Sequence, residues 1–82
     1  MSVRTKQLQA ELDDLDERIK LAINAHEAAK SAFGRLEVSP AHFMWGKLRD
    51  EIDRTLIHQR VLQAHWHRTK AALLEALNAD KE

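Results

Sequence analysis

The stretch from Gly34 to Gly46, GRLEVSPAHFMWG, contains both glycines and the single proline of this chain of 82 residues. Serine is a favourable N-cap and proline fits the first helical position, so Ser39-Pro40 predicts the start of a second helix. Gly34 stands where a helix often ends in a left-handed residue. We therefore expect two helices and one turn: a helix over about residues 3–33, a turn over 34–39 and a helix over about 40–79.

Apolar residues recur at alternating steps of four and three on both sides of this turn. This spacing gathers them into one stripe along each helix, as in coiled coils. Two such helices joined by one turn form an antiparallel hairpin, so the sequence predicts a single all-α domain over residues 1–82. Its expected core residues are Leu12, Leu15, Ile19, Leu48, Ile52, Leu62 and Trp66.

His26 occupies a seam position among the leucines and alanines of the first helix. A polar residue at such a position commonly fixes the alignment of two helices through a hydrogen bond. A pH-sensitive joint is the alternative use of a histidine there. We favour a hydrogen-bonded histidine inside the core.

The second helix carries a further apolar stripe on a side that the first helix would not cover. Its members are Ile57, Val61, His65 and Ala72. The first helix has a smaller stripe of its own, formed by Leu21, Ala25, Ala28 and Ala32. A short chain without cysteine commonly gains stability from a second subunit. The sequence therefore predicts a homodimer, arranged as an antiparallel four-helix bundle, with the second-helix stripe at the dimer interface.

Three bulky side chains, Phe43-Met44-Trp45, follow one another just after the turn. They spread over about 200° of helix surface, so they cannot all enter one seam. Phe, Met and Trp are enriched at the centres of protein interfaces. We expect this cluster to contact a protein partner; the alternative is that it closes the end of the core, which we favour for Trp45 but not for Phe43.

Charge argues against a general attraction to nucleic acid or to anionic membranes. Thirteen basic and thirteen acidic residues give a formal net charge of zero. The basic stretch over residues 54–70 distributes its cations around the helix, unlike a helix that binds phosphates along one face. No apolar run is long enough to span a bilayer. We expect no membrane association and a cytoplasmic protein, with a nucleic-acid-binding helical dimer as an alternative.

Five acidic side chains crowd residues 11–17, whereas residues 54–74 contain none. A hairpin that turns near residue 37 would place the acidic block opposite residues 57–63. Opposite charges would then favour one alignment of the two helices. Each exposed pair contributes only about 0.2–1 kcal/mol, so stability itself is expected to come from the core.

No group of residues has a spacing typical of catalysis or metal binding. His65 and His67 diverge across the helix, there is no cysteine, and no glycine-rich phosphate loop is present. We expect no enzyme activity, no cofactor and no metal. By elimination, the sequence favours a non-enzymatic dimeric interaction module that acts as a regulator, inhibitor or adaptor of a larger, unidentified protein, with a phage or mobile element as one setting. A purely structural coiled-coil assembly is a further alternative.

Overall fold

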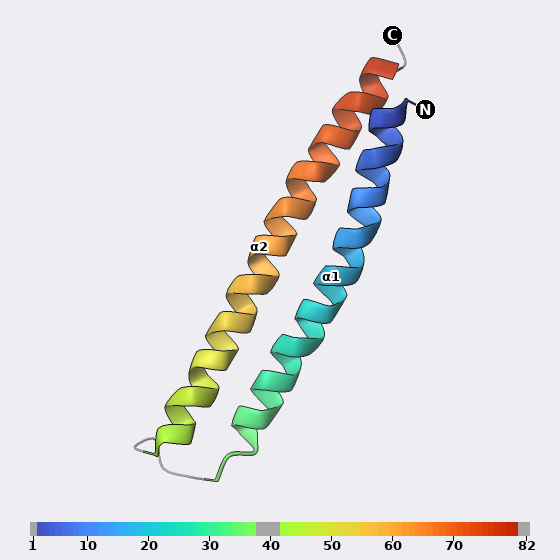
Figure 1. Cartoon of the computed structure of the whole chain (residues 1–82). Coiled ribbons are helices and arrows are strands. Elements are labelled where there is room, and N and C mark those ends of the chain that lie inside the picture. The colour runs from blue at the N-terminus through green and yellow to red at the C-terminus, as the bar shows by residue number, and fades with distance from the viewer. Residues whose placement is uncertain (1, 38–41, 81–82) are drawn as a thin grey trace.

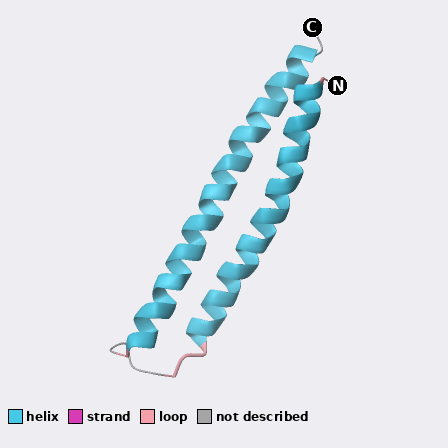
Figure 2. Ribbon diagram, in the orientation of Figure 1, coloured by secondary structure: helices cyan, strands magenta, loops and turns pink. Residues whose placement is uncertain are grey.

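The computed structural model describes residues 2–37 and 42–80, and these form two long helices. Helix α1 spans Val3–Gly34 and helix α2 spans Phe43–Asp80. They lie side by side and antiparallel, in a rod of 63 × 15 × 13 Å with both termini at one end (Figure 1). Helix is the only regular secondary structure in the described ranges (Figure 2). The predicted all-α antiparallel hairpin is confirmed, while Ser39-Pro40 lies outside the described residues.

Helix α1 begins at a capped residue and continues past the predicted end. Ser2 is extended, with φ −70° and ψ 164°, and its Oγ accepts the Thr5 amide hydrogen at 3.1 Å. At the other end Gly34 is still helical, and the C-cap is Arg35 with φ −91° and ψ −2°. The prediction of a left-handed Gly34 is wrong, since no described glycine has a positive φ. No such residue is needed because the Arg35 amide donates to the Ser31 carbonyl at 3.1 Å.

Helix α2 begins with a histidine in the role of a capping residue. Nδ1 of His42 accepts the amide hydrogen of Met44 at 3.1 Å. The carbonyl of His42 accepts the amide hydrogen of Trp45 at 3.0 Å. These bonds satisfy two of the amides that every helix start leaves unpaired. His42 therefore caps the first turn of α2.

The core is a single seam between the two helices. Leu15, Ala22 and Leu62 form a buried cluster, and Ile19 and Trp66 pack against it as half-buried residues. Alanine at the seam lets the two helix backbones approach closely. The other predicted core residues divide between buried Leu12 and half-buried Leu48 and Ile52. Because each helix buries only one stripe of side chains in this seam, most of the surface of the rod is exposed to solvent.

Packing, rather than the charged blocks, accounts for the alignment of the helices. Between the described helices the one ion pair joins Glu11 Oε1 to His65 Nε2 at 3.4 Å, and it is charged only when His65 is protonated. The other described pairs lie within one helix: Asp14–Arg18, Glu17–Lys20, Glu27–Lys30 and Glu51–Arg54. Counting along the antiparallel helices from the contact between His26 and Thr55 places the acidic block level with about residues 64–70, so the expected position opposite residues 57–63 is wrong. Each buried large side chain is worth about 1.5–3 kcal/mol, more than an exposed ion pair.

A small hydrogen-bond network joins the two helices at the end of the hairpin opposite the turn. Thr5 Oγ1 donates to Asp80 Oδ2 at 2.8 Å, and the Ser2 amide donates to the same oxygen at 3.4 Å. The Thr5 side chain is fully buried. The bond from Thr5 and the weaker one from Ser2 hold the pKa of Asp80 below its ordinary value. This network links the first turn of α1 to the last turn of α2.

Replacing Thr5 with valine should raise the pKa of Asp80 toward its ordinary value. The folded-state pKa is depressed, so the network stabilises the fold above about pH 4 and its contribution is lost as pH falls through the folded pKa. An NMR titration of the Asp80 carboxyl carbon measures the change directly. Thr69→Val is the matched control, since Thr69 is also buried but is far along the seam from Ser2. An unchanged Asp80 pKa in the Thr5 variant would contradict the assignment.

Candidate interaction surfaces

Seven large apolar side chains are exposed among the described residues: Val3, Leu21, Ile23, Phe43, Ile57, Val61 and Leu74. Single exposed apolar side chains are normal on a protein surface, so grouping is the informative property. Two groups stand out by position. One lies along one side of the rod and the other at the end where the chain turns.

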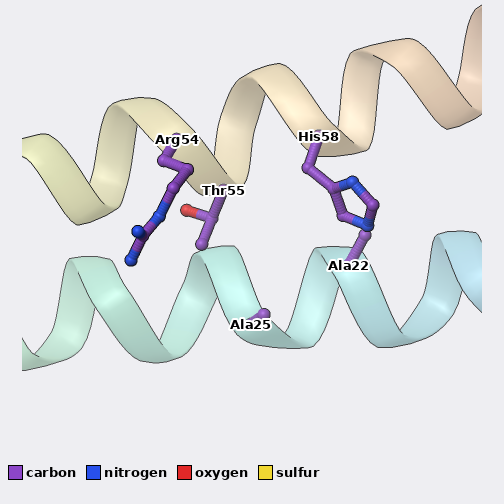
Figure 3. A pocket seen from close by; sticks show the side chains of 5 residues that line it. All are labelled: Ala22, Ala25, Arg54, Thr55 and His58. Atoms are coloured by element: carbon purple, nitrogen blue, oxygen red, sulfur yellow. The ribbon is translucent and has the colours of Figure 1, made fainter.

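The first group, which we call the side face, has Leu21, Ile57 and Val61 at its centre. It borders two adjoining grooves between the helices. Ala22, Ala25 and His58 line both grooves. Arg54 and Thr55 complete one groove; Arg18, Leu21 and Leu62 complete the other. Figure 3 shows Arg54 and His58 extending from α2 toward α1, with the His58 ring beside Ala22. The grooves exist because alanine is small where a longer side chain would fill the space.

The apolar centre of the side face comes from both helices. Leu21 of α1 is 67% exposed, and on α2 Ile57 and Val61 are 63% and 59% exposed. Val61 follows His58 by three residues and Ile57 by four, so it is a neighbour of each of these side chains on the helix surface. The centre therefore offers branched apolar side chains above an alanine floor.

The predicted dimer residues are not equally open in the single chain. Ile57 and Val61 are exposed, whereas His65 and Ala72 are half-buried. His65 contacts Glu11 across the seam, a partner that the sequence did not indicate. Of the smaller α1 stripe, Leu21, Ala25 and Ala28 are exposed and Ala32 is half-buried.

The second group, which we call the loop-end cluster, comprises Phe33, His42, Phe43, Met44 and Trp45. The rings of Trp45 and Phe33 meet edge to face, with centroids 5.4 Å apart and an interplanar angle of 62°. Phe43 is 74% exposed, and the His42 ring stacks on it at 4.7 Å. Met44 is half-buried. Trp45 thus covers the end of the core, while Phe43 with His42 forms an outward aromatic surface.

His26 forms a polar contact inside the seam, as a buried side chain beside Thr55. Its Nδ1 lies 3.0 Å from Thr55 Oγ1. The same hydroxyl lies 2.9 Å from the Glu51 carbonyl, to which it donates in the manner typical of threonine inside a helix. The Thr55 oxygen then accepts the Nδ1 hydrogen of His26. The residue pair bridges the two helices and satisfies Nδ1 of the imidazole.

Removing Thr55 alone should lower the free energy of unfolding more than removing both Thr55 and His26. Thr55→Val leaves a buried imidazole nitrogen without a partner, which is expected to lower the free energy of unfolding by about 1–3 kcal/mol. Adding His26→Leu should recover much of that loss, because the orphaned polar group disappears. Urea unfolding of both single variants and the double variant measures the coupling. Strictly additive losses would show that the two side chains do not interact.

No arrangement of chemical groups for metal binding appears within residues 2–37 and 42–80. No three His, Asp or Glu side chains come together there in a way that could hold a metal ion. A third groove is lined by Lys47, Asp50, Glu51 and Arg54, all on α2, with Glu51 paired to Arg54. Neither described helix is long and apolar enough to cross a membrane.

No family model matches the sequence, and comparison with curated proteins and with solved structures finds no significant similarity. The side face and the loop-end cluster are therefore the features of this chain that bear on its function. Both are apolar surfaces on rigid helices. Such surfaces are suited to contact with other proteins.

Proposed function

We propose that this chain is a non-enzymatic protein–protein interaction module that works as a homodimer joined through the side face. The observation that carries the proposal is the exposure of Leu21, which lines an alanine-floored groove, together with that of Ile57 and Val61 on the neighbouring helix. These side chains come from both helices and lie near the middle of the rod. Pairing two such faces would bury them and produce an antiparallel four-helix bundle.

The shape of the hairpin supports association. The rod is only 15 × 13 Å across, so its seam is one layer of side chains. Within the described ranges only six apolar residues are buried: Leu12, Leu15, Ala22, Ala29, Leu62 and Leu73. Small domains with so little core commonly depend on a disulfide, a metal or another subunit. The chain contains no cysteine, and a second copy would supply the missing layer.

Light scattering over a concentration series tests the dimer. The expected result at tens of micromolar is a mass twice the 9.5 kDa of one chain. Dilution should move the mass toward one chain as the dimer dissociates. A mass of one chain at every concentration, up to hundreds of micromolar, would refute the homodimer.

The loop-end cluster is the proposed site for a second protein, toward which the dimer would act as a regulator, inhibitor or adaptor. Phe43 is the most exposed large apolar side chain of the described residues, and its stacking on His42 holds it in a defined position. Aromatic side chains at such positions are typical centres of protein contacts.

A photo-crosslinking amino acid at position 43 tests the second contact in lysate of the native host. The expected result is a discrete heterologous product that excess unmodified protein suppresses. Arg49, exposed six residues further along α2, is the matched control position. Equal products from both positions, or none from position 43, would refute the role of the loop-end cluster.

A further inference from the structure

We infer that the two copies lie side by side with their termini at the same end, so that α1 of each copy faces α2 of the other. This inference rests on the proposed homodimer and specifies its geometry. The two-fold axis would run parallel to the long axis of the rod. The reversed alternative, with each copy end over end, would place α1 on α1 and α2 on α2.

Side chains seven residues apart form one outward line on each helix, because seven residues are close to two turns. On α1 this line contains Asp14, Leu21 and Ala28; on α2 it contains Arg54, Val61 and Arg68. All six are exposed. The grooves place Leu21 and Arg54 on the same side of the seam. The two lines therefore belong to the same face of the hairpin.

The contact between His26 and Thr55 shows which residues of the two lines lie at the same height along the rod. Counting from it along the antiparallel helices brings Leu21 level with Val61, to within about one residue. One further step of seven brings Asp14 level with Arg68. A step of seven in the other direction brings Ala28 level with Arg54. Each α1 side chain on the line thus has an α2 counterpart at its own height.

With the termini together, each α1 side chain on the line contacts the α2 side chain of the same height in the other copy. Leu21 would pack on Val61 of the second copy, and Asp14 would lie against Arg68 of the second copy. Ala28 is small and leaves room for Arg54. Two-fold symmetry repeats all three contacts, so the apolar centre is flanked by two pairs of opposite charge. Such complementarity fixes the orientation of an interface.

The reversed arrangement places charges of the same sign against each other beside the same apolar centre. It would place Arg54 of one copy against Arg68 of the other, and symmetry would repeat that like-charged contact. At the next step of seven, about 21 Å from the centre at 1.5 Å per residue, the reversed arrangement pairs Lys47 with Glu75 and the other arrangement places Lys47 against Arg35. Solvent and salt screen charges at such a rim more strongly than charges beside a buried patch. The surface charges therefore favour the arrangement with the termini together.

Distances between spin labels on the full-length dimer distinguish the two arrangements. The chain has no cysteine, so Asn78→Cys and Lys47→Cys each introduce one labelling site, at opposite ends of α2. Packed helices lie 8–10 Å apart, so with the termini together both sites should give distances between copies of roughly 15–30 Å. In the reversed arrangement the two labels at position 78 would be about 50 Å apart.

Light scattering on the same labelled samples separates this inference from the proposed function. A dimeric mass with short distances at both sites supports the arrangement. A dimeric mass with the long distance at position 78 overturns the arrangement and leaves the homodimer intact. A monomeric mass overturns both.

Exchanging the charges of the flanking pair gives a second readout. Asp14→Lys alone and Arg68→Glu alone should each raise the dimer Kd about fivefold, since every dimer contains the pair twice. Both changes in one chain should return the Kd to within about twofold of the original. Asp13→Lys, on the adjacent exposed position away from the side face, is the control. Single exchanges that behave like the control would overturn the pairing.

The double exchange also shows whether loss of the Asp14–Arg18 pair accounts for the effect. Asp14 pairs with Arg18 of its own helix at 2.9 Å, and Asp14→Lys breaks that contact. A glutamate at position 68 cannot restore it, because Arg18 remains beside the new lysine. Recovery of dimer affinity in the double variant therefore reports a contact between positions 14 and 68.

Discussion

Replacing Leu15 with alanine is expected to lower the free energy of unfolding by about 3–5 kcal/mol. Leu15 is 2% exposed and belongs to the one buried apolar cluster of the described core, with Ala22 and Leu62. Ala22 beside it is too small to fill the space, so the free-energy cost of a cavity adds to that of the lost apolar burial. Small domains have a total stability near this loss, so much of the variant should be unfolded at room temperature.

Circular dichroism during urea unfolding measures this loss. Leu74→Ala is the matched control, since it makes the same change on an exposed position of α2 away from the side face. The control should change the free energy of unfolding by no more than about 0.5 kcal/mol. Equal losses in the two variants would mean that the seam is not the centre of stability.

The hairpin could be predicted from the sequence because its signals are local. The four-and-three spacing identifies the seam stripe of each helix without any knowledge of the partner. The start of α1 is equally local, because the Ser2 side chain binds the amide of Thr5 within the first turn. Gly34 marks the region of the helix end but not its conformation. The neighbouring carbonyls satisfied the last amides without a left-handed residue.

The alignment of the helices could not be predicted, because it depends on which side chains meet across the seam. Charge suggested one alignment, but the acidic residues pair with cations of their own helix. The partner of His26 became visible only once the helices were placed, although a polar partner was expected. The same holds for Thr5 and Asp80, which are far apart in the chain and meet at the end of the hairpin opposite the turn.

The surfaces were predictable in outline and not in detail. The second stripe of α2 is visible in the sequence, as is the alanine-rich stripe of α1. That both stripes border the same grooves depends on the direction in which each helix faces the other. His42 was missed because histidine is not among the usual capping residues, and its stacking on Phe43 carries no sequence signal.

The double change Ile57→Glu with Val61→Glu is expected to abolish the dimer while the single hairpin stays helical. Both side chains are largely exposed in the hairpin, so glutamate at these positions remains in water when the chain is alone. In the dimer the same changes would place two carboxylates per chain against an apolar surface. Burying unpaired charge costs several kcal/mol, so the dimer Kd should rise about a thousandfold or more.

Light scattering and circular dichroism on freshly diluted protein measure the two halves of this expectation. The mass should fall to that of one chain while the helical signal persists. Leu74→Glu is the matched control, because it places the same charge on an exposed apolar position outside the side face and should leave the mass unchanged. A double variant that remains dimeric would place the interface on another surface. A helical signal lost together with the dimer would mean that the one-layer seam cannot sustain the hairpin alone, so that the second copy is part of the fold itself.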